Sequence, residues 1–254
     1  MSGFAPDHPA ADVRVSPNFG QRNGVGGPDM IVLHYTGMET GAAAEAWLCN
    51  PESQVSSHYL VHEDGRVVQM VRESDRAWHA GKSFWQGTVD INSCSIGIEI
   101  VNPGHAFGYR NFPKRQMTAV AELCRGIIAR HAVPPQRVLA HSDVAPGRKV
   151  DPGERFPWRQ LASAGIGHFV APGRCGGRPL LGPGDRGDAV EELQSMLSLY
   201  GYDIDITGAY DDATGVVVAA FQLHFRPRRV DGLADRSTVE TLRRLLQALP
   251  SGRG

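Results

Sequence analysis

Excess charge of one sign, long apolar runs and closely spaced cysteines are all missing from this sequence. Its 26 basic and 27 acidic residues give a formal net charge of -1, so it lacks the basic excess that drives binding to nucleic acids or membrane surfaces. No stretch approaches the ~18 consecutive apolar residues that indicate a membrane span. We therefore expect a soluble protein with no nucleic-acid partner and no membrane span.

The first 30 residues lack the features of a standard secretory signal. They contain no apolar run, and Asp7, Asp12 and Asn18 interrupt any hydrophobic segment that a signal peptide would need. The sequence therefore predicts no such signal.

The four cysteines, Cys49, Cys94, Cys124 and Cys175, are widely separated. They form no close pair of the kind that structural zinc sites and redox motifs use. Cys124 lies in step with the apolar face of a predicted helix. We expect all four to be free thiols.

Short strand-like runs dominate the first part of the chain. Residues 30–35 are continuously apolar until their polar end, which is typical of a strand covered on both faces. The runs 58–61 and 66–71 flank an Asp-Gly turn, which predicts a hairpin. Residues 95–101 alternate so that Glu99 faces away from the three isoleucines.

Helical periodicity predicts a helix over 114–131 and a shorter one near 40–49. Two prolines at 134 and 135 mark a break before a last strand at 137–140. These elements predict an α/β fold with a mixed central sheet flanked by helices.

The composition shifts to Gly, Pro and Arg between residues 165 and 187, as in an interdomain connector. Three short helical patterns follow, which predict a small three-helix domain. The predicted division is a catalytic domain, a linker and a helical domain over residues 1–170, 171–187 and 188–254.

The segment 141–153 is the most informative for chemistry because it directly follows a predicted strand. His141 and Asp151, separated by a Pro-Gly turn, could supply a nitrogen and an oxygen to zinc, and His34 could complete the site. Catalytic zinc usually keeps three protein ligands and leaves a fourth position for water. Glu99 could deprotonate that water, and Lys149 could stabilise an oxyanion.

Spacing alone leaves other interpretations of these residues open. Ten histidines allow many combinations, and a histidine at a strand end is more often a hydrogen-bonded structural residue than a ligand. Glu99 could equally pair with an arginine, and Lys149 could be a solvated loop residue.

Five blocks, in the family's order, closely resemble the type 2 N-acetylmuramoyl-L-alanine amidases, which include AmpD-like enzymes and are related to peptidoglycan recognition proteins. The blocks are residues 33–36, 57–61, 77–81, 95–102 and 141–153. This resemblance extends over roughly residues 30 to 160.

The resemblance implies a Zn²⁺ site whose ligands are His34, His141 and Asp151. It further implies that Glu99 activates the bound water, that Lys149 steadies the oxyanion, and that the substrate is the lactyl-alanyl amide of peptidoglycan or anhydro-muropeptides. All five expected residues are retained. The alternative is a noncatalytic muropeptide-binding protein.

His58, His62 and His79 are not expected to be ligands, because a tetrahedral site with three protein ligands has no room for them. Trp78 and His79 are candidates for contacting substrate in a groove. Core packing explains Trp78 equally well.

The predicted helical domain resembles C-terminal peptidoglycan-binding domains through residues 189–194, 200–202, 219–222 and 230–232. It departs from their usual pattern at 207–211, which leaves glycan binding open. The alternative is a module that only packs on the amidase domain or mediates self-association.

Two indications of location conflict. A peptidoglycan-binding module favours the intact sacculus and hence the periplasm or cell envelope, whereas the lack of a visible signal favours a cytoplasmic recycling enzyme acting on soluble fragments. The expectation leans slightly to the envelope.

Overall fold

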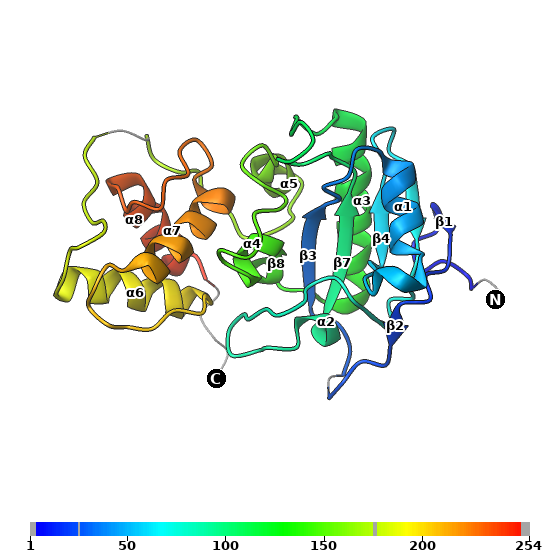
Figure 1. Ribbon diagram of the computed structural model, residues 1–254, viewed down its shortest axis with the longest axis horizontal. Helices are drawn as coiled ribbons and strands as arrows, with labels where there is room; N and C mark the ends of the chain where they lie inside the picture. Colours follow the sequence, from blue (N-terminus) through cyan, green and yellow to red (C-terminus); the bar gives the residue numbers. More distant parts are fainter. Residues whose placement is uncertain (1–3, 25, 175–176, 250–254) are drawn as a thin grey trace.

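The computed structural model describes residues 4–24, 26–174 and 177–249. A sheet-containing region lies beside three helices (Figure 1). In chain order the elements are β1 (Ala11–Val13), β2 (Phe19–Gly20), β3 (Met30–Tyr35), α1 (Gly41–Leu48), β4 (Tyr59–Val61), β5 (Val67–Gln69), β6 (Arg76–Ala77), α2 (Ile91–Cys94), β7 (Ser95–Ile100), α3 (Lys114–His131), β8 (Val138–Ala140), α4 (His141–Val144), α5 (Trp158–Ser163), α6 (Asp188–Tyr200), α7 (Asp212–Phe225) and α8 (Arg236–Gln247).

The main sheet has six strands in the order β1-β5-β4-β7-β3-β8. The strands β4, β7, β3 and β8 run parallel, whereas β5 pairs antiparallel with β4 in the predicted hairpin. A separate pair, β2 and β6, is antiparallel. The predicted mixed sheet flanked by helices is confirmed.

The two faces of the central strands belong to different clusters of apolar side chains. On β3, Ile31 and Leu33 pack with α3, while Met30 and Val32 face the opposite side. This explains why the strand is apolar at successive positions, because both of its faces are covered. The strand was predicted on that basis, and the prediction is confirmed.

Helices α3 and α1 cover opposite faces of the sheet. The inner face of α3 contributes six buried residues, Cys124 among them, to the cluster that holds the isoleucines of β7. Leu48 of α1 packs with Leu60 and Val101 on the other side. Thr40 caps α1 by accepting a hydrogen bond from the Ala43 amide at 3.1 Å.

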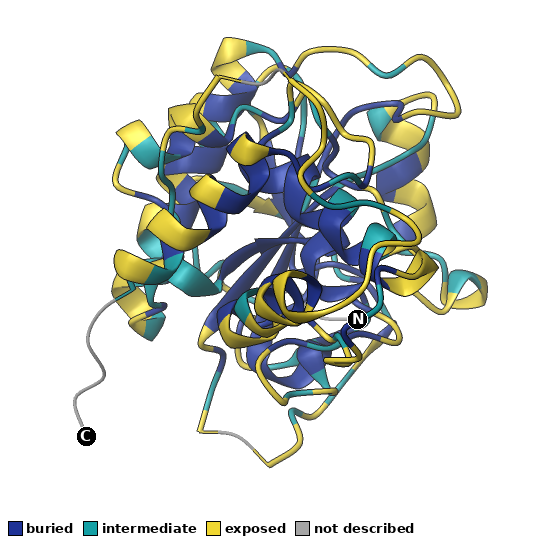
Figure 2. Cartoon of the chain, turned by 90° about the vertical axis from the view of Figure 1, so that its left-hand side faces the viewer, coloured by how far each residue is buried: buried dark blue, intermediate teal, exposed yellow. Residues whose placement is uncertain are grey.

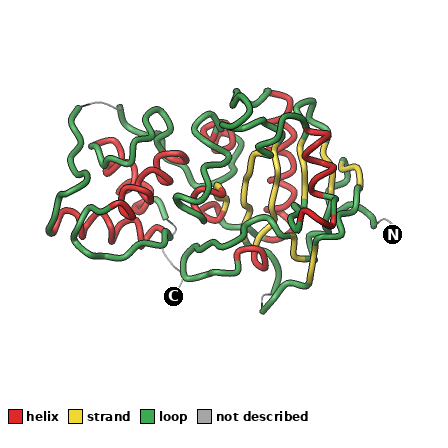
Figure 3. Tube along the Cα trace, viewed as in Figure 1, coloured by secondary structure: helices red, strands yellow, loops and turns green. Residues whose placement is uncertain are grey.

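The three C-terminal helices α6, α7 and α8 form a small bundle joined by loops (Figure 3). Asp211 and Asp235 cap α7 and α8, each accepting the amide hydrogen bond of a threonine three residues on. Gly201 ends α6 with φ of 141°. The three helices predicted from the sequence periodicity are thus present, and two of them have a side-chain cap.

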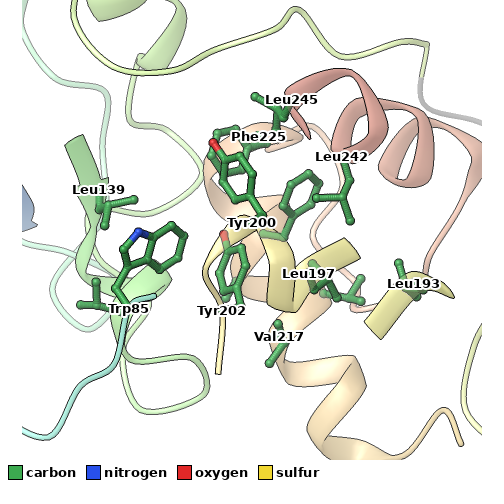
Figure 4. Close-up of a cluster of buried hydrophobic side chains, with 14 of the residues drawn as sticks. Trp85, Leu139, Leu193, Leu197, Tyr200, Tyr202, Val217, Phe225, Leu242 and Leu245 are labelled. Atoms are coloured by element: carbon green, nitrogen blue, oxygen red, sulfur yellow. The ribbon is translucent and has the colours of Figure 1, made fainter. Parts of the chain in front are cut away.

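The two regions share apolar contacts. Trp85 and Leu139 of the sheet region face Tyr200 and Tyr202 of the bundle (Figure 4). Buried residues accordingly continue from the strands to the inner faces of the helices, and the outer helix faces are exposed (Figure 2). The helical module thus packs on the sheet region, and this packing leaves open whether the module also binds glycan.

Cys49, Cys94 and Cys124 are free thiols, as expected, and Cys175 lies outside the described residues. Among the described helices, none combines the length and the apolarity that crossing a bilayer requires.

Candidate active site

His34 and Glu99 lie side by side on neighbouring strands. The parallel register of β3 and β7 pairs these two residues directly, so both side chains project from the same face of the sheet. Each is the fifth residue of its strand. They therefore lie near the carboxyl ends of the strands, where open α/β sheets bind ligands.

His141 and Asp151 reach the same place from the next strand. His141 is the first residue of α4, which directly follows β8. The amide of Ser142 donates a hydrogen bond to the Asp151 carbonyl at 3.0 Å and so fixes the returning loop.

The three predicted ligands converge on one buried point. The Nδ1 atoms of His34 and His141 are 2.8 Å apart, and Asp151 Oδ2 lies 3.1 and 3.0 Å from them, respectively. All three residues are buried. Spacing along the sequence did not decide whether these three residues meet, and in the folded chain they do.

The hydrogen bond behind His141 determines which of its nitrogens carries the proton. Its Nε2 is 3.1 Å from the carbonyl oxygen of Ala80, and a carbonyl can only accept. The proton therefore belongs on Nε2, and the lone pair of Nδ1 points to the centre of the cluster.

A chain of three hydrogen bonds determines which nitrogen of His34 carries the proton. The Ser95 hydroxyl donates to the Ile91 carbonyl at 2.6 Å, so its oxygen accepts from His79 Nε2 at 3.1 Å. His79 Nδ1 is then left to accept from His34 Nε2 at 3.1 Å. Burial, and next the neighbouring His34, lower the pKa of His79 well below its usual range and keep it neutral.

The Nδ1 atoms of His34 and His141 and the Oδ2 atom of Asp151 are electron-rich and have no proton between them. They repel one another unless a cation separates them. Burial, and next the neighbouring His141, lower the pKa of His34 to about 4, so its imidazole stays neutral and able to ligate. Two imidazole nitrogens and one carboxylate oxygen are a donor set that catalytic Zn²⁺ sites use. The residues present therefore fit zinc.

Glu99 carries an oxygen that has no partner among the described residues. Its Oε2 is shielded from solvent and accepts no hydrogen bond there. Burial, and then the negative charge of Asp151, raise the pKa of Glu99 well above its usual range, while Lys149 opposes the rise. A carboxyl group perturbed in this way beside a ligand cluster is typical of proton-transfer residues.

Lys149 belongs to the loop between His141 and Asp151 and is partly exposed. Its backbone amide donates to the Ala145 carbonyl at 3.0 Å. Its side chain lines the same groove as the three ligands and Glu99. The structure thus brings together all five residues singled out for catalysis.

The groove above the cluster has a volume of about 500 Å³, which lies within the range of small-molecule sites. Trp47 of α1 and Trp78 line its walls, and Trp47 is 47% exposed. Trp47 was not among the predicted site residues, although it lies within the helix predicted near 40–49. Large, accessible aromatic surface at a groove provides contact area for a ligand.

The other singled-out histidines have partners elsewhere. His58 Nδ1 accepts from the Gly97 amide at 3.0 Å, and its Nε2 lies 3.0 Å from Arg22. His62 Nε2 lies 2.9 Å from Glu45. His79, proposed from the sequence as a substrate contact, also orients His34, because its Nδ1 lies 3.1 Å from His34 Nε2. No sequence pattern indicated this second role.

Comparison with known proteins decides the family. Residues 24–154, just over half of the chain, match the family described as N-acetylmuramoyl-L-alanine amidase. The chain belongs to this amidase family. This amidase is therefore an enzyme, a hydrolase of amide bonds. Residues 186–242 match a family described as a putative peptidoglycan binding domain.

Relatives support the same assignment over most of the chain. The N-acetylmuramoyl-L-alanine amidase AmiD of Escherichia coli strain K12 is 37% identical, with 86% of this chain and 82% of AmiD covered. The structure of E. coli AmiD with its substrate anhydro-N-acetylmuramic acid-L-Ala-D-gamma-Glu-L-Lys matches with a TM-score of 0.75 at 36% identity, covering 93% of each chain. AMPDH3 from Pseudomonas aeruginosa matches with a TM-score of 0.73 at 30% identity, covering 94% of this chain and 96% of that one.

Proposed function

We propose that this amidase is zinc-dependent and cleaves the amide bond between the lactyl group of muramic acid and L-Ala in peptidoglycan or its anhydro-muropeptides. The observation that carries the proposal is the convergence of two imidazole lone pairs and one carboxylate oxygen on a single buried point. The substrate in the AmiD complex, an anhydro-muropeptide, supports the substrate class.

The proposed division of the chain follows the two family matches. Residues 1–170 form the catalytic domain, residues 171–187 form the connector, and residues 188–254 form the domain that resembles peptidoglycan-binding modules. Partner recognition is divided accordingly: the groove takes the muropeptide, and the helical domain is the candidate for contact with the polymer.

The proposed ligands of Zn²⁺ are His34, His141 and Asp151, whose ligand atoms lie within reach of one ion. Zinc, when bound, acts as a Lewis acid that makes water more acidic and polarises a carbonyl. The two histidines and the carboxylate would hold the ion, and Glu99 lines the same groove as these three residues.

Glu99 is the proposed general base and acid. Its carboxylate takes a proton from the attacking water as the new C–O bond forms at the lactyl carbonyl carbon. It then gives that proton to the nitrogen of L-Ala as the C–N bond breaks. The raised pKa of Glu99 favours this second transfer, because a carboxyl group that holds its proton more tightly is present as the acid at higher pH.

Lys149 is the proposed oxyanion-stabilising residue. Its ammonium group lines the groove near Glu99 and compensates the negative charge that develops on the carbonyl oxygen. Trp78 and His79 are proposed as substrate contacts on the groove wall. A tryptophan there offers a flat face to a sugar or peptide group.

The experiment that tests the function is stem-peptide release, followed by mass spectrometry, from intact sacculi and from soluble anhydro-muropeptide. Zinc-loaded and chelator-treated protein are compared. Zinc-dependent release from sacculi identifies a cell-wall amidase, and release from the soluble fragment alone identifies a recycling enzyme. Absence of release from both substrates would reject the proposal in favour of a muropeptide-binding protein.

A further inference from the structure

A buried carboxylate connects the helical bundle to the predicted metal site. Asp143 belongs to α4, is 0% exposed, and lies where α4 packs beside α7 (Figure 1). Its Oδ1 accepts a hydrogen bond from the Tyr202 hydroxyl at 2.6 Å, and its Oδ2 accepts from His224 Nδ1 at 2.6 Å. Both donors come from the C-terminal bundle, so two of the hydrogen bonds to this carboxylate cross between the regions.

The donor role of Tyr202 follows from its surroundings. Burial, and then the adjacent carboxylate of Asp143, raise the pKa of Tyr202 well above its usual range, so the phenol keeps its proton. A carboxylate buried without such donors carries a large desolvation penalty. The position of α4 therefore depends on the bundle.

The same helix begins with one of the predicted metal ligands, His141. Asp143 Oδ2 also accepts from the amide of Ala140, one residue before His141, at 2.8 Å. The amide of Ser142, one residue after His141, donates to the carbonyl of Asp151 at 3.0 Å. Asp143 is thus connected through the backbone on both sides of His141 and, by one further hydrogen bond, to Asp151.

The surrounding contacts leave little room for α4 to shift while the bundle stays in place. The ring of His224 stacks on Trp158 with centroids 3.6 Å apart. Tyr202 meets Trp85 edge to face at 5.0 Å (Figure 4). A Cβ atom at Gly201 would lie 2.6 Å from Trp85, so only glycine allows this approach. Closely packed contacts of this kind transmit displacement because interiors are nearly incompressible.

We infer that Tyr202 and His224 are positioning residues for the metal site, and that the helical bundle is part of the catalytic unit as well as a candidate for polymer binding. They hold Asp143, and through α4 they set the position of His141 Nδ1 relative to His34 and Asp151. This inference rests on the proposed zinc-dependent function. Neither positioning residue contacts the groove, so their effect passes through the ligands.

The test compares full-length variants that each remove one hydrogen-bond donor. Tyr202→Phe deletes only the hydroxyl, and His224→Phe keeps an aromatic ring against Trp158 without the Nδ1 donor. The matched control is Tyr210→Phe, because Tyr210 is also buried in the bundle and also donates at 2.6 Å, but to the Gly232 carbonyl within the bundle.

The readouts are the dissociation constant for zinc itself, measured by competition with a chromophoric chelator, the thermal midpoint of the zinc-free protein, and kcat and KM on soluble anhydro-muropeptide. We expect Tyr202→Phe and His224→Phe each to weaken zinc binding about tenfold, at the low end for residues that orient metal ligands. We expect kcat to fall with KM unchanged, and Tyr210→Phe to keep the wild-type zinc affinity.

Wild-type zinc affinity and kcat in a folded Tyr202→Phe variant would overturn the inference while leaving the zinc-dependent function intact. If the wild-type protein itself binds no zinc, the proposed function fails and the positioning role fails with it. A drop in thermal midpoint shared by Tyr202→Phe and Tyr210→Phe, without a difference in zinc affinity, would also reject it. Should His224→Phe not fold, Tyr202→Phe decides alone, because it removes a single atom.

Discussion

Glu73, which is buried, and Glu99, which is partly exposed, are two glutamates of the sheet region with opposite surroundings. Glu73 accepts hydrogen bonds from Arg130, His131 and the Tyr59 hydroxyl at 2.6 to 2.8 Å. Burial alone would raise the pKa of Glu73, but these donors outweigh it and lower the pKa to about 2. Glu99, in the groove, has an unpartnered oxygen among the described residues and a pKa raised by burial.

The difference separates a carboxylate that holds the fold together from one that is available to react. A charge whose hydrogen bonds are complete favours the native state and resists protonation. A carboxyl group with a shielded, unpartnered oxygen in a groove disfavours its own charged form and can exchange a proton with a substrate. Substitutions at the two glutamates and in the groove can separate these two roles.

Replacing Glu99 is expected to affect turnover without weakening the fold. Glu99→Gln should lower kcat by about 10³-fold, within the range for loss of a general acid-base group, because the amide cannot take up the proton of water. Kinetics on soluble anhydro-muropeptide and metal analysis of the same sample measure this, and zinc content should stay at the wild-type level. A fully active Glu99→Gln enzyme would remove Glu99 from the mechanism.

Replacing Glu73 is expected to weaken the fold without affecting turnover. Glu73→Gln should lower the free energy of unfolding by about 3 kcal/mol, because breaking a buried ion pair leaves its partners uncompensated. Urea unfolding measures the loss, and kcat per folded molecule should not change. The control is Glu192→Gln at the exposed pair with Arg243, where less than about 1 kcal/mol is expected. Equal losses in the two variants would contradict the distinction.

The contribution of Glu73 to the free energy of unfolding should also appear in its dependence on pH. Since its native pKa is lowered from 4.5 to about 2, the unfolded chain takes up the proton first as the pH falls. The stabilisation is therefore complete above pH ~5 and is lost between pH ~5 and pH ~2, and it amounts to about 3 kcal/mol. Unfolding free energies measured across this range should fall less steeply for Glu73→Gln than for wild type; parallel curves would argue against the lowered pKa.

The groove wall should influence substrate binding rather than stability. Trp47→Ala should raise KM about fivefold, since an exposed aromatic surface beside the substrate would be lost, at about 1 kcal/mol. Steady-state kinetics measure the change, and the thermal midpoint should stay the same. Leu199→Ala, at a residue 71% exposed on the bundle, is the control and should change neither quantity. An unaltered KM in Trp47→Ala would place the substrate elsewhere in the groove.

Most of the fold could be predicted because its elements carry local signals. The apolar run at β3, the Asp-Gly turn between β4 and β5, and the periodicity of α3 each lie within a short segment. Short pieces such as α2 and β6, with 4 and 2 residues, carry too little pattern to be predicted. Their positions depend on the neighbours that complete their hydrogen bonds.

In the candidate site, too, some features were predictable from the sequence and others were not. Residue types and motif spacing indicated His34, Glu99, His141, Lys149 and Asp151, because a resemblance to known amidases preserves identities at fixed places in the chain. The orientation of the side chains had no such signal. Which nitrogen of His34 faces the cluster follows from a relay through His79 and Ser95, and only the folded chain contains that relay.

The chemistry-bearing residues, the α/β class and the three C-terminal helices therefore follow from the sequence alone. The coupling between the two regions exists only in the folded chain, where Tyr202 and His224 meet Asp143 across separations of 59 and 81 residues. The physical reason is that helical periodicity marks which face of a helix is buried but not what covers it. The partner is chosen by packing and by the need to pair a buried carboxylate, and both operate only once the chain has folded.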